Sequence, residues 1–66
     1  MLKLTNHVKF HGKNRSVITT LSPDASHFET ALMDWTGHKL MTLGKYQTYS
    51  DAVTGHKMAC GLFNWA

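Results

Sequence analysis

The first ten residues alternate between apolar and polar side chains. A repeat of two is typical of a strand with one buried face and one solvated face. We therefore expect a strand at 2–11, with an apolar row that Asn6 interrupts and that consists of Leu2, Leu4, Val8 and Phe10.

Three further strands are predicted by β-branched segments and turn residues. Gly12 and Asn14 supply turn chemistry between the first and second strands, and the only proline, Pro23, indicates a change of direction. The segments that we expect are a turn at 12–14, a strand at 15–21, a loop at 22–26, a strand at 27–35, a turn at 36–38 and a strand at 39–43 that Gly44 ends.

The third of these strands has two partly apolar faces, which is typical of a central strand. One row contains Phe28, Thr30 and Leu32, and the other contains Glu29, Ala31, Met33 and Trp35. The alternation does not decide which row meets the rest of the core.

The last third of the chain has helical spacing. Thr48 is a suitable N-cap, and Asp51 suits the positive end of the helix dipole. Gly61 is expected to end the helix in a left-handed conformation. The predicted apolar stripe, with Ala59 beside it, is Tyr49, Ala52, Val53, His56 and Cys60.

With 66 residues, the chain has room for one small domain with a marginal core. We predict an α+β fold, in which a three- to four-stranded antiparallel sheet carries one C-terminal helix on one face. One cysteine permits no internal disulfide, and no apolar run suggests export or a membrane span, so we expect a reducing cytoplasm. The expected parts are a basic hairpin arm at 1–15, the sheet at 16–47, the helix at 48–61 and an apolar tail at 62–66.

The positive charge is concentrated at the N-terminus. Residues 1–15 contain four cations and no acid, namely Lys3, Lys9, Lys13 and Arg15. This cluster is either a solvated strand face that resists aggregation or a patch for nucleic acid. The second interpretation lacks an aromatic side chain on the same face to stack bases.

Glu29 and His56 are the candidates for buried polar chemistry. If the row of Glu29 faces the helix, the two side chains meet, either as a general acid–base pair or as a structural polar pair that fixes the helix on the sheet. We expect the structural pair, because no nucleophile or second carboxylate accompanies it. His7 and His11 share a strand face, but two ligands do not make a zinc site, so we predict no metal and no cofactor.

Two tryptophans are hard to bury in so small a core. Trp35 and Trp65 are therefore expected at a binding surface, to which Met33, Met41 and Met58 could add adaptable contacts. The sheet face without a helix is expected to be apolar enough for a homodimer or a partner-dependent surface.

Several short segments resemble a group of small bacteriophage proteins. They are Ser16-Val17-Ile18-Thr19-Thr20, Phe28-Glu29-Thr30-Ala31-Leu32-Met33, Tyr46-Gln47-Thr48-Tyr49-Ser50-Asp51-Ala52 and Gly55-His56. The chain departs from that group at Asp51, where the relatives carry several acids, and residues 1–15 have no counterpart there. The resemblance implies phage origin and a small sheet-plus-helix fold, with no established activity.

Together, these observations predict a binding protein rather than an enzyme. We expect a phage-encoded protein that binds a host macromolecule, namely a host protein, and inhibits or redirects it in the cytoplasm of an infected bacterium. The alternatives are a nucleic-acid-binding protein that uses the basic arm, or a minor component of the virion. No membrane partner is expected.

Overall fold

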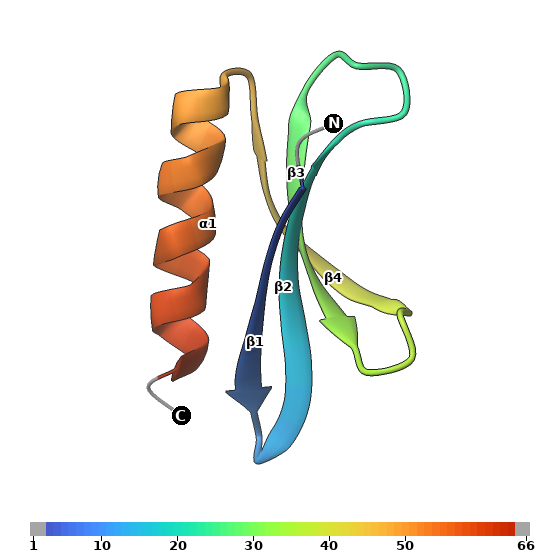
Figure 1. The fold of residues 1–66 in the computed structure, drawn as a ribbon, viewed down its shortest axis with the longest axis vertical. Helices are drawn as coiled ribbons and strands as arrows, with labels where there is room; N and C mark the ends of the chain where they lie inside the picture. The colour runs from blue at the N-terminus through green and yellow to red at the C-terminus, as the bar shows by residue number, and fades with distance from the viewer. Residues whose placement is uncertain (1–2, 65–66) are drawn as a thin grey trace.

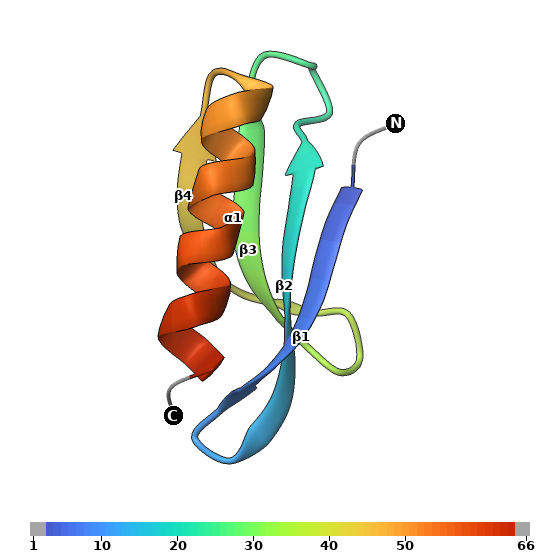
Figure 2. The same cartoon turned by 60° about the vertical axis from the view of Figure 1, so that its left-hand side comes forward.

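The computed structural model describes residues 3–64, which form four strands and one helix. The strands make a single antiparallel sheet in sequence order, and the helix lies along one face of it (Figure 1). Figure 2 shows the helix in front of the sheet, and α1 is the only helix of residues 3–64, so the other face of the sheet carries no helix. This arrangement confirms the predicted α+β class. The elements are β1 (Lys3–Phe10), β2 (Lys13–Leu21), β3 (Phe28–Asp34), β4 (Lys39–Tyr46) and α1 (Tyr49–Asn64).

The first hairpin is tighter than predicted. His11 and Gly12 both have positive φ values, 53° and 74°, as a two-residue hairpin turn of the I′ type requires. The turn therefore lies one residue earlier than expected, and β2 already starts at Lys13. The hairpin is also not a separate arm, because Val8 of β1 is 4% exposed and belongs to the core.

The strand register decides which rows face the helix. Val17 pairs with Leu32, and Thr19 pairs with Thr30; all four side chains are fully buried. The row of Phe28, Thr30 and Leu32 thus faces α1, and the row of Glu29, Ala31 and Met33 lies on the opposite face.

Small residues let α1 approach the sheet closely. Ala52, Gly55 and Ala59 are buried at intervals of three and four residues, so they lie on one side of the helix. The apolar core that results is small, as expected for a chain of this length. It consists of Val8, Val17, Leu32 and Ala59, with Phe10, Leu43, Cys60 and Phe63 packed around them.

The helix starts as predicted and ends later. Thr48 Oγ1 accepts a hydrogen bond from the backbone N–H of Asp51 at 3.2 Å, which confirms the N-cap. The prediction that Gly61 ends the helix is wrong, because α1 continues to Asn64. The first residues of the expected tail therefore belong to α1, where Phe63 packs edge-on against Phe10 at 5.2 Å between ring centroids. Trp65 lies outside the described residues.

The fourth strand also continues past its predicted end. Gly44 does not break β4, which reaches Tyr46. A Cβ atom at Gly44 would lie 2.9 Å from Tyr46 Cζ, and one at Gly55 would overlap the same ring. The tyrosine ring thus fills the space above both glycines, and this explains why glycine occurs inside a strand and inside a helix.

Candidate functional site

The face of the sheet that α1 leaves uncovered, called the open face here, is defined by the strand pairing. Each row across it takes one residue from each strand, because paired residues point to the same side. The rows are Lys3, Thr20, Glu29 and Lys45; then Thr5, Ile18, Ala31 and Thr42; then His7, Ser16, Met33 and Lys39.

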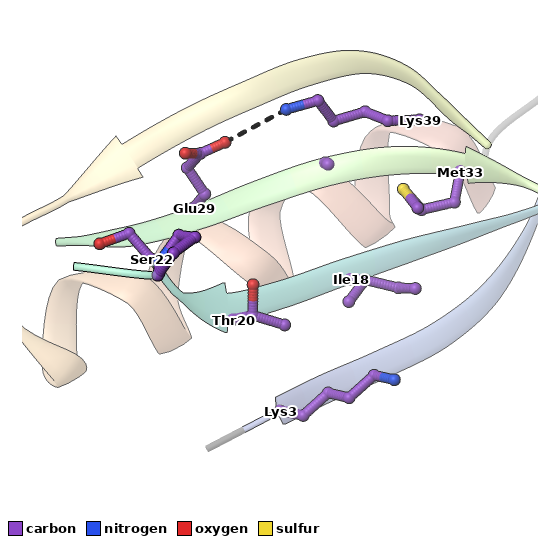
Figure 3. A pocket seen from close by; sticks show the side chains of 9 residues that line it. Lys3, Ile18, Thr20, Ser22, Glu29, Met33 and Lys39 are labelled. Carbon is purple, nitrogen blue, oxygen red and sulfur yellow. Dashed lines mark hydrogen bonds and ion pairs between the residues drawn. The ribbon is translucent and has the colours of Figure 1, made fainter. Parts of the chain in front are cut away.

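The centre of the open face is a shallow hollow of about 480 Å³. Ile18, Ala31 and Met33 contribute its apolar lining (Figure 3). Lys3 and Lys39 lie along its two sides, and Ser22 with Pro23 closes one end. Thr20 and the carboxylate of Glu29 complete the lining, so the hollow is a trough with an apolar floor, a lysine on each side and one acidic side chain.

Four lysines occupy the two edges of this face. Lys3 and Lys9 come from β1, and Lys39 and Lys45 from β4; the edges are about 14 Å apart, three inter-strand spacings. The only carboxylate that the described strands carry to this face is Glu29. Outside this face the charges cancel, because the three remaining cations are matched in number by three carboxylates. The cations are Lys13, Arg15 and Lys57, and the carboxylates are Asp24, Asp34 and Asp51. The formal net charge of +3 thus belongs to the open face.

Glu29 is held within this basic surface. Its Oε2 lies 3.2 Å from His27 Nε2, and its Oε1 lies 3.4 Å from Lys39 Nζ. The hydrogen bond from His27, followed by the positive charge of Lys39, lowers the pKa of the Glu29 carboxyl below its ordinary value. Glu29 stays ionised; it forms an ion pair with Lys39 and lies opposite Lys45 in the strand pairing, so Lys3 and Lys9 are the lysines of this face that have no acid beside them.

The basic residues predicted at 1–15 do not form one site. Lys3 and Lys9 belong to the open face, but Lys13 pairs with Phe10 in a row on the other side. Arg15 donates from Nη1 to the backbone oxygen of Asn14 at 2.9 Å. Sequence reasoning missed Lys39 and Lys45, whose place in the same rows as Met33 and Glu29 became evident only with the register.

Trp35 follows β3 and is 81% exposed. It lines a small cavity of about 130 Å³ together with His7, Asn14, Arg15 and Ser16. His7 and Ser16 are an open-face pair. An exposed aromatic ring therefore borders the basic face, although the sequence analysis expected none there.

The predicted pair of Glu29 and His56 is not formed, because the two residues lie on opposite sides of the sheet. His56 is 4% exposed, and its partners come from β1 and β2. His56 Nδ1 lies 2.7 Å from Thr19 Oγ1, and Nε2 lies 2.8 Å from Asn6 Oδ1. Thr19 Oγ1 is in turn 2.6 Å from Thr30 Oγ1. The expected polar contact between helix and sheet exists with different partners.

The direction of the bonds in this network follows from donor chemistry. A carbonyl oxygen only accepts, so His56 Nε2 donates to Asn6. Burial lowers the pKa of His56 below its ordinary value of 6.5, and the neutral ring then accepts at Nδ1 from the Thr19 hydroxyl. Thr30 donates to Thr19. Both ring nitrogens are bonded to side chains of the sheet, and His56 is only 4% exposed, which is the arrangement of a structural histidine.

The other reactive side chains are dispersed. Burial raises the pKa of the Cys60 thiol, which packs against the core. Residues 3–64 contain no group of three or more histidine, cysteine, aspartate or glutamate side chains placed to hold a metal ion. The methionines are not gathered on one surface either: Met33 lines the open face, whereas Met58 lines a cleft between α1 and β4.

Comparison with known proteins gives no relative. No family model, curated protein or solved structure matches the chain. The resemblance to small bacteriophage proteins therefore stays a prediction. In the described part of the chain, no helix has both the length and the apolar character that crossing a membrane demands.

Proposed function

We propose that the protein binds nucleic acid through its open face. The observation that carries this proposal is the placement of Lys3, Lys9, Lys39 and Lys45 on one face against the single carboxylate of Glu29. Following the resemblance, the setting that we propose is the cytoplasm of an infected bacterium.

The arrangement of the lysines suits a charged backbone. Two basic edges flank a hollow with an apolar floor, so phosphates can contact the edges while the remainder of the strand lies over the floor. Such contacts release counterions and give affinity that depends on salt more than on sequence. Lysines on edge strands also discourage sheets from pairing edge to edge. The two roles differ in one respect: only nucleic-acid binding predicts that removal of these lysines changes a salt-dependent affinity for oligonucleotides.

The double variant Lys3→Gln/Lys9→Gln tests the proposal. In a gel-shift or anisotropy titration with single-stranded and duplex oligonucleotides, we expect affinity to fall about 10- to 30-fold, since an exposed ion pair contributes roughly 1 kcal/mol. The slope of log affinity against log salt should become less steep by about 0.7–0.9 for each lysine removed.

The matched control is Lys13→Gln/Lys57→Gln, which lowers the net charge equally from exposed positions outside the open face. We expect the control to retain most of the affinity. Equal losses in the two variants would mean that only net charge matters and would contradict an open-face site. No shift with the native protein at micromolar concentration would reject nucleic-acid binding altogether.

A second candidate function is binding of a host protein, which a different surface favours. Along α1, Met58 is 68% exposed and Leu62 is 76% exposed. Both line an apolar cleft of about 220 Å³ that Leu43 and Tyr46 complete. Large apolar side chains gathered beside a cleft are typical of protein-binding surfaces.

This second candidate has a test of its own. Affinity capture from nuclease-treated bacterial lysate should recover a stoichiometric host protein with the native chain and lose it with Met58→Glu/Leu62→Glu. The variant Lys57→Gln, on the same helix, should retain it. Recovery that is insensitive to Met58 and Leu62, or that disappears with nuclease, would count against protein binding through the cleft.

A further inference from the structure

The turn between β3 and β4 is tightly organised around Asp34. Its Oδ1 accepts hydrogen bonds from the backbone N–H of Thr36 at 2.9 Å, from the Thr36 hydroxyl at 2.7 Å and from the backbone N–H of His38 at 2.9 Å. Gly37 has a φ of 94°, a positive value that glycine adopts without steric strain. The backbone on both sides of Trp35 is thus fixed, and a ligand that contacts the ring need not order this turn first.

The surroundings of Trp35 are polar and basic. The cavity beside it combines the ring with Arg15, His7 and Asn14. Arg15 Nη1 is bound to the Asn14 carbonyl, which anchors the guanidinium. Arg15 Nε is buried and has no hydrogen-bond partner among the described residues. At about 130 Å³, the cavity is well below the size of a pocket for a whole cofactor, about 300–1,000 Å³, and it suits one planar group.

We infer that Trp35 and this cavity form a stacking subsite for one unpaired nucleobase, and that the open face therefore prefers single-stranded to duplex nucleic acid. The inference rests on the proposed function and names its substrate class. A base stacks on the indole face and can form hydrogen bonds with His7 and Asn14 at the edge of the cavity. The backbone then continues along the row that starts at His7 and Ser16 toward the lysines. A duplex cannot use the subsite, because its bases are already stacked on one another.

The experiment compares Trp35→Ala and Trp35→Phe with the native chain in titrations of oligothymidylate and of a duplex. We expect Trp35→Ala to bind oligothymidylate about 5- to 150-fold more weakly, with duplex affinity changed less than twofold. Trp35→Phe should recover part of the loss, because it retains an aromatic face. The salt slope should stay unchanged, since no phosphate contact of the lysines is removed. In a Trp65→Phe background, Trp35 is the only tryptophan, and its fluorescence should be quenched by oligothymidylate.

The outcomes separate the subsite from the proposed function. If Trp35→Ala binds both oligothymidylate and the duplex as the native chain does, with the same dependence on salt, the subsite is rejected and the proposed function stands. An equal loss for single strand and duplex also rejects base stacking. If the native chain shows no salt-dependent binding to oligothymidylate or to the duplex, both proposals fail. Because Trp35 is 81% exposed, its variants should keep the native melting transition, which thermal unfolding monitors.

Discussion

Replacement of His56 by leucine is expected to lower the free energy of unfolding by about 1–3 kcal/mol at pH 7. Leucine fits the apolar surroundings of α1, but it leaves the Thr19 hydroxyl without its acceptor and Asn6 without its donor. Thr19 is fully buried, so no solvent can replace the lost partner. Asn6 is exposed and can turn to water, so most of the cost falls on Thr19.

The same substitution should change the pH dependence of stability. Because burial lowers the pKa of His56, the folded ring is neutral at a pH where the unfolded chain takes up a proton. Its contribution is fully present above about pH 6.5 and is lost as the pH falls toward the folded pKa, by at most about 1.4 kcal/mol per pH unit. The lowered pKa values of Glu29 and Asp34 act only below their ordinary values of 4.5 and 3.8.

Urea unfolding followed by circular dichroism measures both the loss of stability and its pH dependence. The measurements run from pH 7.5 to pH 5, about 1–1.5 units on either side of the ordinary histidine pKa. His38→Gln is the control, since the His38 side chain is 86% exposed. A double-mutant cycle with Thr19→Val adds a second criterion: removing both partners should cost less than the sum of the single changes. Unchanged stability and unchanged pH dependence in His56→Leu would show that the network contributes nothing.

The network also illustrates what the sequence could and could not predict. The strands and the helix follow from repeats of two and of about 3.6 residues, which are local properties of the chain. The partner of His56 depends on which row of β3 faces the helix, and both rows are partly apolar. The available signal was polar residues within inward rows, namely Asn6, Thr19 and Thr30. Each interrupts an apolar row at a position where a buried side chain needs a partner.

The basic face was predicted only in part for a similar reason. Clustering in sequence identified Lys3 and Lys9, which share a strand, together with Lys13 and Arg15. Clustering in space adds Lys39 and Lys45, which follow Lys3 and Lys9 by 30 or more residues and reach the same face through strand pairing. Register is set by tertiary pairing, so a one-residue shift would have moved each lysine to the other side.

The glycines of α1 show how a tertiary contact overrides a local rule. Glycine generally weakens helices or ends them, and the sequence analysis expected Gly61 to end this one. In the structure Gly55 and Gly61 both lie inside α1, but only Gly55 is buried and covered by the Tyr46 ring, whereas a Cβ atom at Gly61 would have nothing within 4 Å. The two glycines of this helix therefore have different roles. Gly55 makes room for the Tyr46 ring, whereas no neighbouring atom requires a glycine at position 61.

Alanine substitutions at these two positions should change stability in opposite directions. Gly61→Ala is expected to raise the free energy of unfolding by about 0.5–1 kcal/mol, the ordinary gain of alanine over glycine in a helix. Gly55→Ala gains the same helix propensity but pushes the new methyl group into the Tyr46 ring, and overpacking typically costs about 1–3 kcal/mol. Its net effect should be a loss of up to about 2 kcal/mol in urea unfolding.

The Tyr46→Ala background separates steric conflict from other effects of Gly55→Ala. Without the ring, the methyl group has space, so Gly55→Ala should turn from destabilising to neutral or stabilising, while Gly61→Ala keeps its sign. If Gly55→Ala stabilises the native chain as much as Gly61→Ala does, then the Tyr46 ring moves aside at no cost. In that case β4 packs on α1 less closely than the structure shows. The positions of Lys39 and Lys45, which belong to β4, would then be less firmly fixed relative to the rest of the open face.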